Sequence, residues 1–192
     1  FLEDMNKRFY SQGKRSLVYL GTLNGKKVII KKIKPNTKAV NSIKKEAYWL
    51  KKLEKHKFSP KLITQGKDYV VMEFIQGERI LDFLEKANKS DSLKVISKII
   101  DICKTLDKLN ITKKEMHKPI KHILIQKNNP RFIDFERSKF SKKPKNLTQF
   151  CQFLTSKKVS SILNKKGIKI NKNKLRIFLK KYKSRQYPVF GA

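Results

Sequence analysis

The first third of the chain alternates short apolar runs with turn residues and then changes to helical spacing. Ser16–Leu23 and Lys26–Ile33 are strand-like, and Asn24-Gly25 between them is the strongest short signal for a two-residue hairpin turn. Two further strand-like runs lie at 62–63 and 69–75. Apolar residues at the spacing of one helix face separate these runs from the hairpin, at Val40, Ile43, Ala47, Leu50 and Leu53. The pattern predicts a mostly β segment with one helix.

Helical spacing dominates after Gln76-Gly77, which we interpret as a hinge. A short helix is expected at Ile80–Lys86 and a long one at 92–109. The core-facing stripe of the long helix is predicted to comprise Leu93, Ile96, Ile99, Ile100, Cys103, Leu106 and Leu109.

Three shorter helices are expected in the tail. Asn146 is predicted to cap the first, with Gln149 placed for a capping-box contact, and Gly167 is predicted to end the second. Their apolar positions are Leu147, Phe150, Cys151 and Leu154, then Val159, Ile162 and Leu163, then Leu175, Phe178, Leu179 and Tyr182. The Lys-rich faces of the last two helices either face solvent or contact RNA phosphates, and their spacing favours neither.

A second hairpin is predicted at 122–126 and 131–135, with Asn128-Asn129-Pro130 as the turn. Asp134 then lies at the end of an apolar run, between Ile133 and Phe135. A carboxylate in such a place is costly unless a cation meets it. The alternative is a surface Asp that points outward.

Lys31 offers such a cation, because it follows the β-branched run Val28-Ile29-Ile30 on a strand with at least one buried face. A Lys on a buried face needs an anionic partner. Glu46 lies on the apolar side of the next helix, one turn from both Ile43 and Leu50. The sequence therefore predicts a Lys31–Glu46 ion pair. The alternative is that Glu46 borders the apolar stripe and reaches solvent.

Composition changes the picture mainly through charge. The 192 residues are long enough for one core or two small lobes, and 39% hydrophobic residues with 10% aromatics indicate a folded protein. The formal net charge is +33, with Lys dispersed along the chain. Dispersed Lys is consistent with a solvated surface or with nucleic-acid or ribosome contact.

Cys103 and Cys151 fall at apolar positions of predicted helices and are expected to be core thiols of a reducing compartment. No apolar run has the length of a membrane span, and no leader with a cleavage site opens the sequence. We therefore expect a cytoplasmic protein without membrane contact. The sequence starts at Phe1 rather than Met, so its natural beginning is left open.

The order of these motifs resembles the protein kinase superfamily. That family combines a Gly-rich loop, a strand Lys paired with a helix Glu, a hinge, a catalytic loop and a metal-binding Asp in an Asp-Phe-Gly turn. The matching residues are Ser11, Gly13, Ser16 and Val18-Tyr19 for the loop, Val28-Ile29-Ile30-Lys31 and Glu46 for the pair, 71–75 for the hinge, and Asp134-Phe135-Glu136 for the turn, with Glu in place of Gly. The resemblance covers nearly the whole chain.

This resemblance implies Mg²⁺-ATP as the ligand. Lys31 is then expected to hold the α- and β-phosphates, Glu46 to orient Lys31, and Asp134 to carry the metal. Gly13 and its neighbours Ser16 and Val18 are expected to cover the phosphates. Met72 is expected behind the adenine, which the backbone of Glu73 and Ile75 would bind.

Two departures from the family pattern matter. Only 58 residues follow Asp134, and no Ala-Pro-Glu element occurs among them. A full peptide-binding lobe and a long activation segment therefore do not fit. The chain is most similar to the small atypical kinases of the RIO and KEOPS-associated kind, and within them to compact archaeal proteins predicted to be serine/threonine kinases.

The second departure is in the catalytic loop. Aligning 122–125 with the family's Asn-Ile-Leu run puts His122 at the metal-binding Asn and His117 at the catalytic Asp. A neutral imidazole can accept a proton or bind a metal, so His117 is the candidate base and His122 a candidate ligand. Glu115 is the alternative base. Lys118 or Lys121 is the candidate for neutralising charge on the transferred phosphoryl group.

We therefore expect one α+β kinase-like domain with a β-rich lobe at 1–75 and a reduced helical lobe at 76–192. The expected activity is transfer of the γ-phosphate to a protein Ser/Thr hydroxyl or to water. The alternative is a pseudokinase that has lost catalysis and uses its basic surface to bind RNA, the ribosome or a protein.

Overall fold

The structure, a computed structural model, describes residues 5–35 and 40–186. It divides into two compact units, the first made of residues 1–76 and 131–138 and the second of residues 77–130 and 139–192. The segment 131–138, which carries Asp134, therefore belongs to the same unit as Lys31 and Glu46. That the two units are lobes of one domain stays a prediction.

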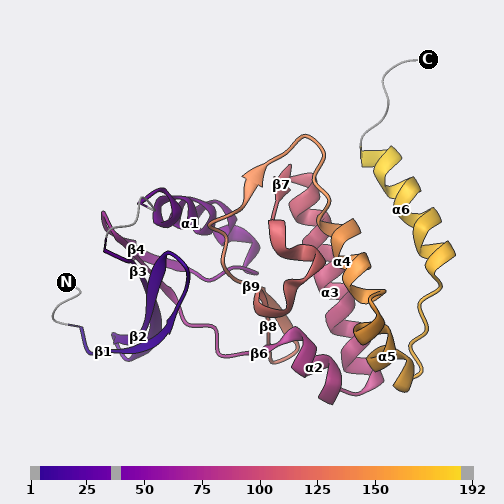
Figure 1. Ribbon diagram of the computed structural model, residues 1–192, viewed down its shortest axis with the longest axis horizontal. Helices are drawn as coiled ribbons and strands as arrows, with labels where there is room; N and C mark the ends of the chain where they lie inside the picture. The colour runs from indigo at the N-terminus through magenta and orange to yellow at the C-terminus, as the bar shows by residue number, and fades with distance from the viewer. Residues whose placement is uncertain (1–4, 36–39, 187–192) are drawn as a thin grey trace. The chain divides into compact units, whose positions relative to one another are not determined.

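The first unit is built on a five-stranded antiparallel sheet (Figure 1). Its strands, in spatial order, are β1 (Lys7–Gln12), β2 (Ser16–Leu23), β3 (Lys26–Ile33), β5 (Tyr69–Glu73) and β4 (Leu62–Gln65). The predicted β2–β3 hairpin is confirmed with its bounds. Asn24 and Gly25 have φ of 49° and 73°, as a two-residue hairpin turn requires. The edge strand β1 was not predicted, since five of its six residues are exposed.

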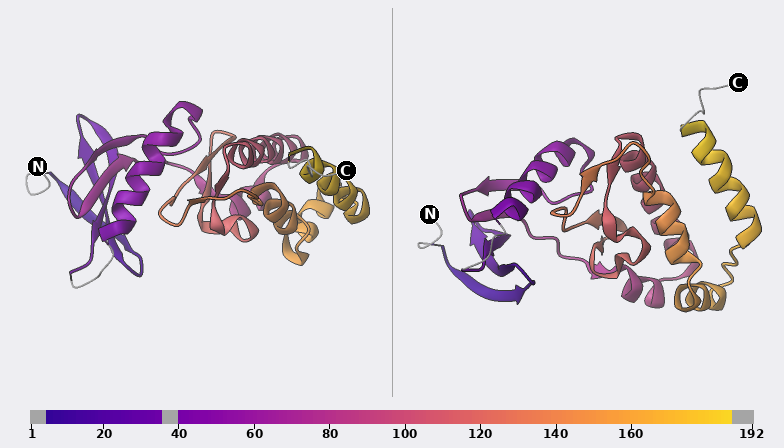
Figure 2. Two further views of the ribbon diagram at one scale, coloured as in Figure 1. Left: turned by 90° about the horizontal axis from the view of Figure 1, so that it is seen from above. Right: turned by 45° about the horizontal axis from the view of Figure 1, so that its top comes forward.

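Helix α1 (Val40–Leu53) lies against one face of this sheet (Figure 2). Ile43, Ala47, Leu50 and Leu53 are buried as predicted, whereas the side chain of Val40 lies outside the described residues. A 3₁₀ turn, η1 (Glu54–His56), follows the helix. The chain leaves η1 at Lys57, whose φ of 59° ends the helical path.

The second unit is mainly helical. Its elements are β6 (Glu78–Arg79), α2 (Ile80–Lys86), α3 (Lys89–Lys108), β7 (Ile111–Thr112), η2 (Lys114–His117), η3 (Pro119–Lys121), β8 (Ile123–Gln126), the start of β9 (Asn129–Phe132), β10 (Lys139–Phe140), α4 (Asn146–Leu154), α5 (Lys157–Lys165) and α6 (Lys172–Gln186). The bounds predicted for α2 are confirmed. Helix α3 begins earlier than predicted, because the Asn88 side chain accepts a hydrogen bond from the Asp91 amide at 2.8 Å and caps it.

The predicted stripe of α3 is wrong at Leu93, whose side chain is 44% exposed. Ser92 and Val95 are fully buried in its place. The buried line follows spacings of three and four residues from Ser92 through Val95 and Ile99 to Cys103, so Leu93 lies at its edge. Cys103 and Cys151 are both buried and free, as predicted.

The turn of the second hairpin was predicted one position too late. Lys127 and Asn128 have φ of 50° and 58° and form the turn, so Asn129 and Pro130 already lie in β9. Proline fixes φ near −65° and cannot supply the positive φ that such a turn requires. Strand β9 ends at Phe132, and Asp134 lies in the loop after it.

Asn146 does not cap α4, contrary to prediction. Its side chain is fully buried, donates to Asp107 Oδ1 at 2.7 Å, and accepts the Lys113 amide at 2.9 Å. The Asp107 carboxylate of α3 caps the helix instead, by accepting the amides of Asn146 and Leu147 at 2.9 and 3.3 Å. The capping-box contact of Gln149 is absent, since its side-chain Oε1 accepts no hydrogen bond from the described residues.

No helix among the described residues is long and apolar enough to cross a membrane.

Candidate functional site

The site is centred on Lys31 of β3, whose neighbours across the sheet are Val18 of β2 and Val70 of β5. The predicted ion pair with Glu46 is present, with 2.7 Å between Lys31 Nζ and Glu46 Oε2. The same ammonium lies 3.2 Å from Asp134 Oδ1. One cation therefore joins two carboxylates, one from helix α1 and one from a loop. The loop residue, Asp134, lies 103 residues after Lys31 in the chain.

Glu46 is the most deeply buried charged residue of this group, with 1% of its surface exposed. Its Oε2 accepts from Lys31, and its Oε1 accepts the Phe135 amide at 3.2 Å. A buried carboxylate is tolerated when each oxygen has a partner, which is the case here. Glu46 thus connects the strand cation to the backbone of the Asp134 loop.

Contacts within the first unit hold the loop at residues 131–138 in place. Arg131 binds the Glu73 carboxylate at 2.7 Å and the Ser59 carbonyl at 3.0 Å. The Phe132 amide donates to the Phe58 carbonyl at 2.7 Å, and the Trp49 indole of α1 donates to the Ser138 carbonyl at 3.1 Å. Asp134 is therefore flanked on both sides by anchored backbone.

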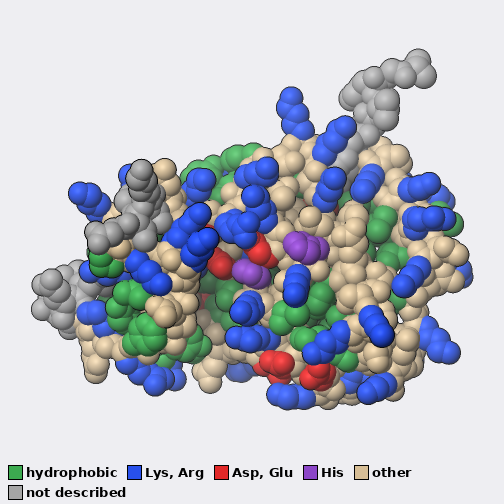
Figure 3. Space-filling view, viewed as in Figure 1, with side chains coloured by type: hydrophobic (Ala, Val, Ile, Leu, Met, Phe, Trp, Pro, Cys, Tyr) green, Lys and Arg blue, Asp and Glu red, His purple; other side chains and the backbone are tan. Residues whose placement is uncertain are grey.

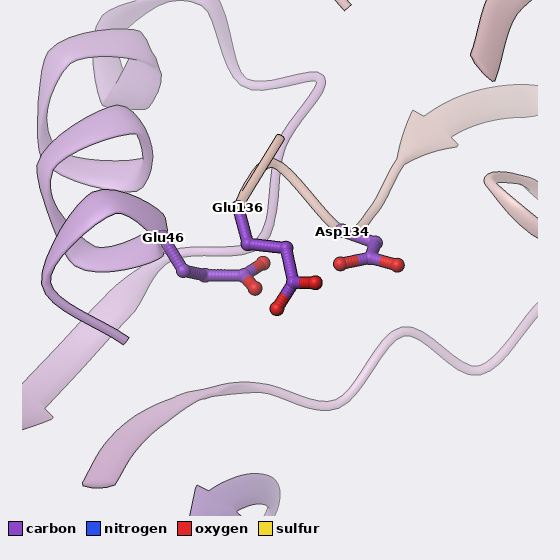
Figure 4. Close-up of side chains that lie close together, drawn as sticks. All are labelled: Glu46, Asp134 and Glu136. Atoms are coloured by element: carbon purple, nitrogen blue, oxygen red, sulfur yellow. The ribbon is translucent and has the colours of Figure 1, made fainter. Parts of the chain in front are cut away.

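Three carboxylates meet at this loop: Glu46, Asp134 and Glu136 each offer one oxygen, and these oxygens lie within 4.8 Å of one another. Figure 4 shows the Glu136 side chain between those of the other two. An oxygen-only set of carboxylates is what Mg²⁺ prefers. Glu46 is engaged by Lys31 and Phe135, so Asp134 and Glu136, which are partly exposed, fit a hard cation best.

These charges raise the pKa values of both Lys31 and Glu136, which favours the charged form of the lysine and the neutral form of the acid. Burial alone would lower the pKa of Lys31, but the Glu46 and Asp134 carboxylates outweigh it and raise that pKa above its ordinary value. Burial and then the neighbouring Asp134 charge raise the pKa of Glu136, although Lys31 partly offsets them. The protein thus keeps Lys31 charged and makes ionisation of Glu136 less favourable than that of an ordinary glutamate.

The residues expected to bind adenine lie on and after β5 in the same unit. Met72 and Ile75 are 4% and 5% exposed. The Glu73 amide already donates to the Lys61 carbonyl at 2.9 Å, and its carboxylate accepts from Arg131 and the Lys61 amide. A base could therefore use only the carbonyl of Glu73, while its side chain anchors the Asp134 loop.

The residues expected to cover phosphates lie in the β1–β2 connection and in β2. The Gly13 amide donates to the Ser16 carbonyl at 2.8 Å, which closes a tight turn. Ser16 is buried, Gly13 is exposed, and Val18 pairs with Lys31 across the two strands. This connection is a hairpin turn that contains a single glycine.

The candidates for catalysis lie in the second unit. Glu115 and His117 belong to η2, Lys118 joins it to η3, Lys121 ends η3, and His122 follows. His117, Lys118 and Lys121 are exposed, whereas Glu115 and His122 are partly buried. Their roles stay predictions.

Sequence reasoning missed three residues, two in the Asp134 loop and its flank and one beside the catalytic candidates of the second unit. Glu136 was treated only as a replacement for glycine, although its position two residues after Asp134 is a usable signal. Arg131 gave no signal, because an Arg in a short strand next to a turn is usually a surface residue. Lys113 is fully buried with its Nζ 3.6 Å from Glu115 Oε2, and nothing separates it in sequence from the exposed lysines.

Comparisons with known proteins found a family profile, a relative and a solved structure that are similar to this chain. The profile described as "Protein tyrosine and serine/threonine kinase" matches residues 6–146, more than half of the chain. An uncharacterized protein of Methanocaldococcus jannaschii is 36% identical over 115 residues, which are 58% of this chain and 98% of that protein.

Among solved structures, the Rio2 kinase–ADP/Mg²⁺–phosphoaspartate complex from Chaetomium thermophilum matches with a TM-score of 0.63 and 15% identity. The match covers 88% of this chain and 57% of the Rio2 chain, so this chain spans little more than half of that protein's length. At this identity the likeness shows the fold alone.

Proposed function

Because this chain belongs to the protein tyrosine and serine/threonine kinase family, we propose that it binds Mg²⁺-ATP and transfers the γ-phosphate to a protein Ser/Thr hydroxyl or to water. The predicted α+β kinase-like fold is confirmed. The finer assignment, to the small atypical RIO- and KEOPS-associated kinases, is supported by the likeness to Rio2 and by the short archaeal relative.

The observation that carries the proposal is Lys31 between Glu46 and Asp134, at 2.7 and 3.2 Å. In the proposed complex, Lys31 binds the α- and β-phosphates and Glu46 keeps it aimed at them. This pair is already formed at 2.7 Å, and the Glu46 and Asp134 carboxylates raise the pKa of Lys31 and keep its ammonium charged. Such preorganised charge is the main contribution a protein makes to phosphoryl transfer.

Asp134 and Glu136 are the residues that we propose hold Mg²⁺, with His122 of the second unit as a further candidate ligand. When bound, Mg²⁺ would neutralise charge on the phosphates. Glu136 fits this role because its carboxylate lies beside Asp134 in surroundings that oppose its negative charge, which a cation relieves.

The remaining roles follow the family pattern. Gly13, Ser16 and Val18 cover the phosphates, and Met72, Ile75 and the Glu73 carbonyl contact the base. In the second unit His117 or Glu115 accepts the proton of the attacking hydroxyl, and Lys118 or Lys121 lies near the transferred group. The acceptor is proposed to be a protein hydroxyl because the matched family acts on proteins.

The alternative function is that of a pseudokinase that binds nucleotide and uses its basic surface as a docking module. The net charge of +33 and the two His residues at the catalytic-loop positions favour it. Both functions include ATP binding, so only a measurement of chemistry separates them.

Phosphate transfer from ATP labelled at the γ-position tests the proposal. We expect wild-type protein with Mg²⁺ to release labelled phosphate or to label itself, and Asp134→Asn to lose this activity by a factor of at least about 100. Asn suits the control because it tolerates the positive φ of Asp134. Equal silence of both proteins, with ATP binding intact, would favour the pseudokinase.

Two further variants identify the base. Glu115→Gln and His117→Gln each remove one candidate proton acceptor and keep a side chain of similar size. Loss of the base is expected to lower kcat by about 100-fold or more with little change in KM, whereas the other variant keeps most of its activity.

A further inference from the structure

The positive charge of the protein is less evenly distributed than its many lysines suggest. Residues 137–192 contain 17 Lys and Arg and no Asp or Glu, so they carry more than half of the net charge of +33 in less than a third of the chain. Their described part forms β10 and the helices α4, α5 and α6 of the second unit. Lys and Arg side chains outnumber the acidic ones on the visible face of the molecule (Figure 3).

Helix α6 concentrates this charge. Its 15 residues include seven Lys and Arg and no acidic residue. At 100° per residue, three of these cations share one side of the helix with Phe178. They are Lys174, Lys181 and Arg185, which we name the α6 ridge. The ridge is about 16 Å long.

The α6 ridge is electrostatically uncompensated. None of its three cations forms an ion pair within the part of the chain that the structure describes. Lys181 and Arg185 lie four residues apart on the helix, where like charges repel one another. Unpaired cations on one side of a helix without acidic residues are the electrostatic footprint of a polyanion site.

The apolar side of α6 is already in use. Leu175, Leu179 and Tyr182 are partly buried, and the Tyr182 hydroxyl donates to Asp107 Oδ2 of α3 at 3.2 Å. Figure 1 and Figure 2 both show α6 on the outer side of the second unit, beyond α4. A helix that inserts into a bilayer needs a wide exposed apolar face, which α6 does not offer.

Two large apolar side chains on α6 nevertheless remain accessible, Ile177 at 53% and Phe178 at 46% exposure. The Phe178 ring stacks on Tyr182, with 6.4 Å between centroids and 18° between planes. An exposed aromatic ring among unpaired cations suits a ligand that presents both phosphates and flat bases. Proteins that bind single-stranded nucleic acids typically stack bases on aromatic rings and contact the phosphate backbone with Lys and Arg side chains.

From these observations we propose that α6 binds a single-stranded nucleic acid. The α6 ridge contacts phosphates of the strand, and Phe178, on the same side of the helix, stacks on an unpaired base. Recognition is of backbone and base faces, so it is independent of sequence. This inference goes beyond the proposed phosphotransfer and does not require it, because no residue of α6 belongs to the candidate ATP site.

Fluorescence anisotropy of the full chain with labelled oligo(U) and oligo(dT) of about 20 nucleotides tests the proposal. With three phosphate contacts, binding is expected to weaken by about 20-fold between 50 and 200 mM salt. Preference for oligo(U) would identify RNA, and equal affinity would identify any single strand. A preference for duplex RNA over both single strands would contradict the proposal.

Two matched triple variants separate the α6 ridge from overall charge. Lys174→Gln, Lys181→Gln and Arg185→Gln remove the three ridge cations. Lys44→Gln, Lys45→Gln and Lys51→Gln remove three exposed cations of α1 and change the net charge equally. The ridge variant is expected to reduce the slope of log Kd against log salt by about two, and the α1 variant to leave it unchanged. Equal losses in the two variants would overturn the proposal.

Phe178→Leu tests the stacking step, since Leu keeps an apolar helix-forming side chain in place. It is expected to weaken binding of oligo(U) by about fivefold or more and to leave binding of heparin, a polyanion without bases, unchanged. Vesicles with anionic lipid serve as the membrane arm. Binding to these vesicles without binding to either oligonucleotide at 50 mM salt would overturn the proposal. An equal effect of Phe178→Leu on the binding of heparin and of oligo(U) would also overturn it. Asp134→Asn should bind oligo(U) like wild type.

Discussion

At the scale of single residues, Asp134 combines an unusual backbone with a charged contact. Its φ of 64° lies in the left-handed region, which L-residues other than Gly, Asn and Asp rarely adopt. The conformation points its carboxylate to within 3.2 Å of Lys31 while the Phe135 amide reaches Glu46. Backbone held in such a region by its surroundings is typical of functional sites.

Removing the charge of Glu46 should destabilise the protein by about 2 kcal/mol, because Lys31 and the Phe135 amide both lose a charged partner. We expect Glu46→Gln to show this loss in urea unfolding. Glu78→Gln is the matched control, since Glu78 pairs with the exposed Lys86 at 3.2 Å and should cost less than about 0.5 kcal/mol. Similar losses in the free energy of unfolding for the two variants would show that the contacts of Glu46 do not stabilise the fold more than a surface ion pair does.

In the absence of bound metal, the charge of Glu136 should instead lower the free energy of unfolding. Its pKa is raised in the folded state, mainly by burial and by the Asp134 charge, so its ionisation opposes folding. The penalty is absent below its ordinary pKa of 4.5, where both states are protonated, and is complete once the pH exceeds the raised value. Glu136→Gln should therefore be more stable than wild type at pH 7.5 in EDTA.

Urea unfolding at pH 4 and pH 7.5 checks this sign, because the advantage of Glu136→Gln should shrink at the lower pH. Addition of Mg²⁺ at pH 7.5 should stabilise wild type more than the variant, since the cation binds only the charged carboxylate. An advantage that is equal at both pH values would show that Glu136 acts through packing rather than charge.

For helices and strands, the local sequence pattern predicted the bounds of an element where turn residues and apolar periodicity agree. β2, β3 and α2 have the predicted bounds, and α1 spans the predicted apolar positions, because Asn24-Gly25 specifies its turn and the apolar spacing of α1 is unbroken. β1 escaped prediction because an exposed edge strand shows no alternation. Asn146 was misread because a buried carboxylate from another helix took over the cap, which sequence spacing does not reveal.

The Asp107 cap gives a test at this scale. Asp107 is 1% exposed and accepts from the Asn146 amide and side chain, the Leu147 amide and Tyr182. Asp107→Ala leaves several buried donors unsatisfied and should cost about 3 kcal/mol in urea unfolding. Asp101→Ala on the same helix, at a side chain 71% exposed, should cost less than about 0.5 kcal/mol. A small loss for Asp107→Ala would mean that water replaces the carboxylate.

At the scale of the whole molecule, the order of motifs predicted more than periodicity did. Lys31, Glu46 and Asp134 meet as expected, although 103 residues separate the first from the last. The supporting contacts of Arg131 and the burial of Lys113 could not be predicted, because single charged residues on short elements read as surface. The concentration of charge after Glu136 was visible in the sequence but was hidden by the lysines elsewhere.

The net charge itself predicts an unusual response to salt. Self-repulsion at +33 opposes the compact state, and added salt screens it over distances beyond the Debye length, about 10 Å at 0.1 M. The Tm should therefore rise by several degrees between 20 and 300 mM NaCl at pH 7.5. Differential scanning calorimetry measures this directly. A Tm that falls with salt would mean that ion pairs such as Lys31–Glu46 outweigh the repulsion.

If Lys31 and Asp134 bind Mg²⁺-ATP together, as we propose, calorimetric titration of ATP with and without Mg²⁺ will show it. Wild type should bind ATP about tenfold or more tightly with Mg²⁺. Asp134→Asn should lose this dependence on Mg²⁺, and Lys31→Met should weaken binding under both conditions. Undetectable binding by wild type, or an unchanged Mg²⁺ effect in Asp134→Asn, would mean that these residues do not form a Mg²⁺-ATP site.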